Sequence, residues 1–142
     1  MRLAEDDARA RLAAHDHGVL CTVHAERGVD AVPVVYAVDA DGYLGVPVDR
    51  VKPKAAGRLQ RERNLEADPR ATLLVEHWDP ADWARLWWVR AELRSETDTD
   101  TAREAALATR LADRYPQYRD QPFDRVLVLR IVGLTGWAGA EH

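Results

Sequence analysis

Apolar and polar positions alternate along several stretches of the chain, a pattern typical of β-strands with one buried face. The clearest alternation is WARLWWVRAELR at residues 83–94, and the face expected to be core carries Trp83, Arg85, Trp87, Val89, Ala91 and Leu93. Clusters of Asp, Gly and Pro separate the runs. The predicted strands are residues 17–24, 31–38, 43–48, 71–77, 83–94 and 125–137.

Helical spacing of apolar residues favours helices at residues 3–14 and 101–114. A third, arginine-rich helix is predicted to begin at Pro53, because proline suits the first helical position, and to end in the stretch NLEADP at residues 64–69. The strands follow one another mostly through short turns, which makes them antiparallel. We therefore predict a mainly β fold with flanking helices, a six-stranded antiparallel closed or split β-barrel, since closure removes exposed strand edges.

Composition is that of an ordinary globular protein. The chain has 142 residues, of which 46% are hydrophobic and 31% charged, and we expect a single domain over residues 1–142. Its one cysteine, Cys21, allows no internal disulfide. The N-terminus is charged, without a signal-peptide core, and no apolar stretch reaches the length of a membrane span. These features predict a cytoplasmic location without a membrane partner.

Both lysines of the chain stand in one tripeptide, Lys52-Pro53-Lys54, although Lys and Arg together number 20. In a sequence that otherwise uses arginine, paired lysines indicate that compact point charges are needed there. Pro53 would open a helix whose free N–H groups and positive dipole end favour a phosphate or carboxylate. The tripeptide therefore predicts an anion-binding turn.

The predicted helix extends this cationic site. With a helix that starts at Pro53, the side chains of Lys54, Arg58 and Arg61 fall at i, i+4 and i+7 and share one face. The whole chain carries a net charge of −4, and a local cationic pocket on an acidic protein fits a small anionic ligand better than nucleic acid. An ordinary solvated helix face is the alternative interpretation.

Patterns for catalysis by side chains or metal ions are missing from the sequence. It has no GxSxG, Walker A or GxGxxG motif, and Cys21 has no cationic pattern nearby to activate it. The histidines lack metal-ligand spacing, and His15 and His17 resemble a helix end and a turn. We expect no metal site and nominate no catalytic side chain, which leaves catalysis by a bound cofactor open.

One long segment resembles a known superfamily. The string KPKAAGRLQRERNLEADPRATLLVEHW, preceded by AVPVVYAVDADGYLGVPVD and followed by ARLWWVRAELR, is similar to the split β-barrel flavin and deazaflavin oxidoreductases, the pyridoxamine 5'-phosphate oxidase-like class. The similarity is strongest to the branch of coenzyme F420-dependent enzymes common in actinobacteria, and it includes the late YPQY and TGW. Residues 52–70 are its most specific part.

The resemblance implies a homodimer with two cofactor sites at the interface, each built from both subunits. The cofactor phosphate would bind where the third strand meets the helix, and the ring system would lie against the second and third strands. Trp88 and Arg90 would come from the partner subunit, and a sheet rim or a dimer contact is their alternative role. The candidate cofactor-binding residues are Pro33, Val34, Val35, Val46, Pro47, Val48, Lys52, Lys54, Arg58, Arg61, Trp88 and Arg90.

A departure from the pyridoxamine phosphate oxidases favours coenzyme F420 over FMN. Those enzymes carry a basic residue in the second strand, where this chain has the apolar run AVPVVYAV. The resemblance thus implies an F420-dependent oxidoreductase that transfers a hydride between the reduced deazaflavin and a small organic acceptor. The alternatives are an FMN-binding oxidoreductase of the same fold, a haem-related binding protein and a non-catalytic protein that stores its cofactor.

Overall fold

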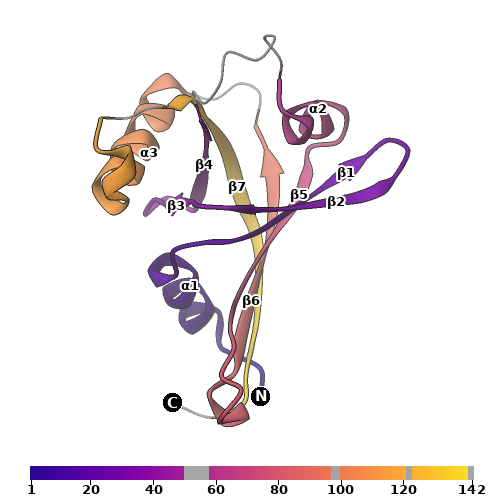
Figure 1. Cartoon of the computed structure of the whole chain (residues 1–142), viewed down its shortest axis with the longest axis vertical. Coiled ribbons are helices and arrows are strands. Elements are labelled where there is room, and N and C mark those ends of the chain that lie inside the picture. The colour runs from indigo at the N-terminus through magenta and orange to yellow at the C-terminus, as the bar shows by residue number, and fades with distance from the viewer. Residues whose placement is uncertain (50–57, 97–99, 121–122, 141–142) are drawn as a thin grey trace.

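The structure is a computed structural model, and it describes residues 1–49, 58–96, 100–120 and 123–140. Figure 1 shows the arrangement of the elements. The helices are α1 (Glu5–Ala14), α2 (Gln60–Ala67) and α3 (Thr101–Arg114), with 3₁₀ turns η1 (Trp83–Arg85) and η2 (Pro116–Tyr118). The strands are β1 (Gly18–His24), β2 (Gly28–Val34), β3 (Ala37–Val38), β4 (Tyr43–Asp49), β5 (Arg70–His77), β6 (Trp87–Ser95) and β7 (Phe123–Ala138).

The described strands form one antiparallel sheet of seven strands in the order β2-β1-β5-β6-β7-β4-β3. The mainly β fold with flanking helices is confirmed. The prediction of six strands is wrong, and so is closure of the sheet, because within the described residues no ladder joins edge strand β2 to β3 or β4. From Val46 to Asp49, β4 pairs only with β7. We call the unpaired boundary between β2 and this half of β4 the seam.

The predicted strand at residues 31–38 is divided at Tyr36, because the backbone and side chain of Tyr36 form hydrogen bonds with residues outside the sheet. The Tyr115 hydroxyl lies 2.9 Å from the carbonyl oxygen of Tyr36 and accepts from its N–H at 3.5 Å, so a side chain takes the place of a ladder. The fully buried Tyr36 hydroxyl donates to the carbonyl of Leu12 at 2.5 Å. The chain thus passes from one sheet edge to the other within Val35 and Tyr36.

Two hydrophobic clusters lie on opposite faces of the sheet. The main core packs Ala8 and Leu12 of α1 against inward side chains, among them the predicted core residues Val89, Ala91 and Leu93, each 0% exposed. The same prediction is wrong for Trp83 and Arg85, because they lie in η1, before β6 begins, and Trp83 is 66% exposed. On the other face, α3 contributes Leu107 and Leu111, which pack against the cluster completed by Ala37, Phe123, Val126 and Val128. Successive side chains of β7 point to opposite faces of the sheet, so this strand contributes residues to both clusters.

The helices at both ends of the sequence agree with prediction, whereas the middle one is shorter than expected. Leu59 is extended (φ −63°, ψ 155°) and α2 begins at Gln60, so a helix that runs from Pro53 through Arg61 is wrong. The carboxylate of Glu62 accepts the N–H of Leu59 at 3.0 Å and so fixes this start. The predicted stop at Asp68 and Pro69 is confirmed, since Asp68 caps the helix.

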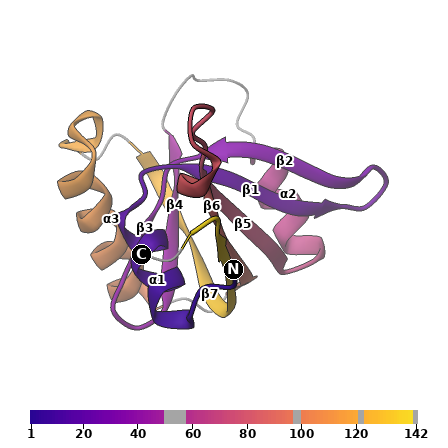
Figure 2. The same ribbon diagram turned by 90° about the horizontal axis from the view of Figure 1, so that it is seen from below.

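The hairpin of β1 and β2 extends away from the body of the molecule, as both ribbon views show (Figure 1, Figure 2). The N-terminus lies beside the end of β7, because the Met1 amino group donates to the carbonyl of Ala138 at 2.8 Å. None of the described helices is long and apolar enough to cross a membrane.

Candidate functional site

A cleft of about 290 Å³ lies at the seam, between the end of β2 and the second half of β4. Both strands supply apolar walls, and polar residues reach the cleft from α2, from η2 and from the segment before β1. The residues that line it are His17, Pro33, Val34, Val35, Val46, Pro47, Asp49, Arg61 and Tyr118.

Two prolines help to explain why the seam stays open. Pro33 lies in edge strand β2 opposite Val19, and Pro47 lies in β4 opposite Val126. Proline has no N–H for a ladder and is confined to strand edges and bulges. Facing segments that each contain a proline are therefore poor partners for closing the sheet. Pro33 accordingly lies in a strand at the edge of the sheet.

Half of the predicted cofactor-binding residues line this single cleft. They come from three elements that are separate in sequence. Val48, which is 3% exposed, does not line it. Lys52 and Lys54 lie outside the described residues. The predicted residues brought together are Pro33, Val34, Val35, Val46, Pro47 and Arg61.

Arg61 provides a positive charge at the polar end of the cleft. Its Nε is buried and has no hydrogen-bond partner in the described part of the chain. Burial lowers the pKa of the Arg61 guanidinium, while the charges of Glu62 and Asp49 act in the opposite direction. An unpaired buried donor is rare in proteins. Arg61 is therefore suited to hold an anionic group that enters the cleft.

Tyr118 and Asp49 form the other polar pair of the cleft. The Tyr118 hydroxyl donates to Asp49 Oδ1 at 2.9 Å. Burial, followed by the hydrogen bond to Asp49, raises the pKa of Tyr118 to about 12. The phenol therefore remains a neutral hydrogen-bond donor at neutral pH.

An ion pair ties the start of α2 to the sheet and so positions Arg61. Arg125 of β7 donates through Nε to Glu62 Oε2 at 2.6 Å and through Nη2 to Glu62 Oε1 at 2.5 Å. Burial by itself raises the pKa of Glu62, but the bonds from Arg125 and Leu59 outweigh it, so the pKa lies below its usual value. The residue next to Arg61 is thus anchored to the sheet.

Asn64 anchors the same helix to the β1–β2 hairpin. Its buried amide nitrogen donates to the hydroxyl of Thr22 at 2.9 Å and to the carboxylate of Asp30 at 3.0 Å. The side chain of Gln60 in turn donates to the Asn64 oxygen at 2.9 Å. Asn64 lies inside α2, and these contacts hold the helix against the hairpin.

The remaining predicted residues lie away from the cleft. Arg58, expected on the cationic face, forms an ion pair with Glu66. Trp88 and Arg90 lie on the outer face of β6, with the guanidinium 5.4 Å from the Trp88 ring centre. Their ladder neighbours on β7 are Trp137 and Thr135. The described residues of one chain do not bring this pair to the cleft.

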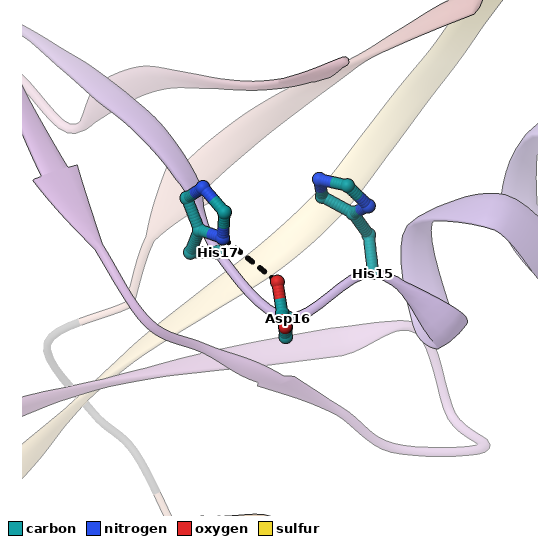
Figure 3. A group of neighbouring side chains, drawn as sticks. All are labelled: His15, Asp16 and His17. Atoms are coloured by element: carbon teal, nitrogen blue, oxygen red, sulfur yellow. Dashed lines mark hydrogen bonds and ion pairs between the residues drawn. The ribbon is translucent and has the colours of Figure 1, made fainter. Parts of the chain in front are cut away.

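His17 brings a further cluster to the edge of the cleft. It lines the cleft and bonds through Nδ1 to Asp16 Oδ1 at 2.7 Å, and its ring stacks on that of His15 with centres 5.5 Å apart (Figure 3). Burial lowers the pKa of His15, and the hydrogen bond from His17 lowers that of Asp16. The sequence spacing gave no sign of this group.

Neither a protein-family model nor a curated protein matches the sequence. Solved structures do match the fold. A FAD-binding protein from Mesorhizobium loti has a TM-score of 0.71 at 16% sequence identity, with 96% of this chain and 95% of that chain covered. HutZ, the haem storage protein of Vibrio cholerae, has a TM-score of 0.61 at 17% identity, with 94% of each chain covered. The chain shares their fold.

A third similar structure is a protein proposed to be a pyridoxamine 5'-phosphate oxidase, from Corynebacterium glutamicum. Its TM-score is 0.59 at 14% identity, with 96% of this chain and 90% of that chain covered. The predicted likeness to the pyridoxamine 5'-phosphate oxidase-like class is thus confirmed for the fold. The cofactor, the reaction and the F420 branch stay predictions, because identities this low establish the fold alone.

Sequence reasoning missed three residues of the cleft, His17, Asp49 and Tyr118. They come from the α1–β1 link, the end of β4 and η2, and only the folded chain brings them together. One signal was available for the last of these, since Tyr118 belongs to the YPQY stretch that forms part of the family resemblance.

Proposed function

We propose that the protein is a coenzyme F420-dependent oxidoreductase, which transfers a hydride between the reduced deazaflavin and a small organic acceptor. The observation that supports this most directly is that residues proposed for the cofactor from sequence come together in one cleft at the seam. The cleft combines apolar walls with a few polar groups, as ligand sites commonly do. It offers one surface for a flat ring and another for an anion.

Arg61 supports the fit of an anionic cofactor. A phosphate in the cleft would accept a hydrogen bond from the guanidinium of Arg61, which lines the cleft. Such a charge-assisted bond is stronger than one between neutral groups. Lys52 and Lys54 follow β4 closely in the sequence and are proposed to share this role.

The chain's own residues would bind and orient the cofactor. Pro33 and Val35, which line the cleft and are not buried, would pack against the ring system and exclude water from it. Arg61 would hold the phosphate and so fix the position of the ring along the seam. The bound deazaflavin supplies the hydride chemistry.

We propose that the active form is a homodimer in which the outer face of β5, β6 and β7 meets the partner. This face exposes large apolar side chains, which is typical of interfaces: Leu74 is 38% exposed, Val132 42% and Trp137 38%. Trp88 and Arg90 lie among them on the same face. In the dimer, Trp88 and Arg90 would contact the cleft of the partner subunit.

A second candidate function is cofactor storage without catalysis. It is favoured by the structural similarity to HutZ, which is named a haem storage protein. The same cleft would then hold haem or a flavin as cargo, with Arg61 paired to a carboxylate or phosphate. Both functions predict binding at the seam, and they differ in whether an acceptor is reduced.

The deciding experiment titrates the untagged protein side by side with F420, FMN and haem. The double variant Lys52→Ala/Lys54→Ala is compared with Arg9→Ala/Arg85→Ala, which removes two exposed cations elsewhere. We expect F420 to bind most tightly and the lysine variant to bind it about a hundredfold more weakly, which corresponds to roughly 3 kcal/mol. The control variant should bind like the wild type.

The same sample decides between catalysis and storage. Reduced F420 bound to the protein is mixed with small conjugated acceptors such as quinones, and reoxidation is followed by absorbance. Reoxidation faster than in free solution supports the oxidoreductase. Tight binding that protects reduced F420 from these acceptors supports storage, whereas tighter binding of FMN or haem overturns the F420 assignment.

A further inference from the structure

The link between α1 and β1 gathers two imidazoles and a carboxylate in three consecutive residues, His15, Asp16 and His17. One ligand atom from each lies within 4.8 Å of the other two. Figure 3 shows the Asp16 carboxylate between the two rings and its bond to His17. We propose that this cluster binds a divalent transition-metal ion, with Zn²⁺ as the representative case.

The two imidazole rings lie close together. His15 follows the last turn of α1 with φ −79° and ψ 152°, which is extended. The ring centres of His15 and His17 are 5.5 Å apart with an angle of 29° between their planes.

Residues at the end of α3 form hydrogen bonds with the main chain of this link. The guanidinium of Arg114 donates to the carbonyls of Ala13 and His15, and the hydroxyl of Tyr115 donates to the carbonyl of Asp16 at 2.6 Å. Hydrogen bonds from such supporting groups fix the positions from which metal ligands extend. The link is therefore a preorganised segment.

Two of the three side chains can rotate toward an ion. Those of His17 and Asp16 are 68% and 71% exposed, whereas the His15 ring packs edge-on against Trp87 with ring centres 5.3 Å apart. Zinc binds imidazole nitrogen at ~2.0–2.1 Å and carboxylate oxygen at ~2.0–2.2 Å, which places the ligand atoms of a tetrahedral site about 3.4 Å apart. A small rotation of the side chains brings the present group to that spacing.

The ligand set selects the class of metal. Two neutral imidazoles and one carboxylate suit Zn²⁺, Ni²⁺ and Cu²⁺, whereas Mg²⁺ and Ca²⁺ prefer oxygen ligands alone. Three protein ligands leave a fourth position for water or another molecule. Because His17 also lines the seam cleft, the ion would lie at the edge of the cleft. This inference does not rest on the proposed oxidoreductase function.

The test is a calorimetric titration of untagged, chelator-treated protein with Zn²⁺ and with Mg²⁺. The variants are His15→Ala, Asp16→Asn and His17→Gln. The control is His24→Gln, which removes a half-buried histidine whose Nδ1 accepts the N–H groups of Glu26 and Arg27, each at 3.0 Å. Circular dichroism of each variant checks that the fold is retained.

We expect one Zn²⁺ per chain and no measurable Mg²⁺ binding. Each of the two histidine variants should bind Zn²⁺ at least tenfold more weakly, Asp16→Asn severalfold more weakly, and His24→Gln as the wild type does. If His15→Ala disturbs the fold, the exposed His17→Gln change decides the matter alone. Absence of Zn²⁺ binding, Zn²⁺ affinity unaltered in His17→Gln, or equal loss in His24→Gln would overturn the proposal.

Discussion

Glu62 and Arg125 join α2 to β7 through two hydrogen bonds, of 2.6 and 2.5 Å. The Glu62 side chain is 8% exposed and that of Arg125 is 39% exposed. The carboxylate also accepts the N–H of Leu59, so one buried charge holds both the helix start and the sheet. Arg61 directly precedes Glu62 in the helix, so this ion pair helps to hold the guanidinium of Arg61 at the cleft.

The Arg125→Ala variant should be destabilised by about 2 kcal/mol, because it leaves the buried Glu62 carboxylate without its charged partner. The matched control is Arg130→Ala on the same strand, which breaks the more exposed pair of Arg130 with Glu96 at 2.8 Å. That change should cost less than about 0.5 kcal/mol. Urea unfolding measures both, and equal losses in the two variants would contradict this role for Glu62.

Acid should weaken the fold partly through Glu62. Its pKa in the folded protein lies below the usual 4.5, so its stabilising contribution is full above that pH and is lost as the pH falls through the folded-state pKa. Glu62→Gln should therefore lower stability at neutral pH and show a smaller further loss in acid than the wild type. Unfolding free energies at about pH 7 and about pH 3 test this. Parallel pH profiles for the two proteins would argue against it.

Gly45 permits the close approach of α3 to β4. A Cβ at this position would lie 2.9 Å from a methyl carbon of Val126 and 3.0 Å from the Cβ of Leu107. Gly45→Ala should therefore cost about 1–3 kcal/mol through overpacking. Gly133→Ala is the control, since its new methyl would meet mainly the flexible carboxylate of Glu92. Thermal unfolding compares the two, and a tolerated Gly45→Ala would show that α3 can move outward freely.

The proposed dimer is tested on the outer face of the sheet. Trp88→Glu places a charge among apolar side chains there and should shift the protein to monomers in analytical ultracentrifugation. Trp78→Glu changes an exposed tryptophan, 58% accessible, that lies beyond the end of β5 and should leave the oligomeric state unaltered. A wild-type protein that is monomeric at micromolar concentration would contradict the proposed dimer.

Local patterns predicted much of the fold because they record local physics. The alternation at Val89, Ala91 and Leu93 identified core positions, and the Asp68–Pro69 stop marked the end of α2. The break at Tyr36 was not visible, because its cause is a hydroxyl 79 positions away, on Tyr115. Helix spacing from Pro53 failed for the same reason: Glu62, anchored by distant Arg125, sets where the helix begins.

The apolar residues of the site that lie in strands were predicted from sequence. The residues His17 and Tyr118, which come from separate, distant segments, were missed. Pro33 and Pro47 carried a signal, since each lies on a strand segment with a partner on only one side. The segments that contain His17 and Tyr118 meet only through tertiary contacts, and neither residue stands in a motif with recognised chemistry. Arg61 was expected on a helical face with Arg58, yet it reaches the cleft from a helix that begins after Arg58.

The central claim is that an anionic, ring-bearing cofactor binds in the seam cleft with Arg61 at its charged end. It is tested most directly by titrating F420 into Arg61→Ala and Arg63→Ala, which remove the same charge from the cleft side and the exposed side of one helix. We expect Arg61→Ala to bind F420 about 10–100-fold more weakly, as loss of a charge-assisted bond implies, and Arg63→Ala to bind within about twofold of the wild type. Equal affinities in both variants would contradict binding at the seam.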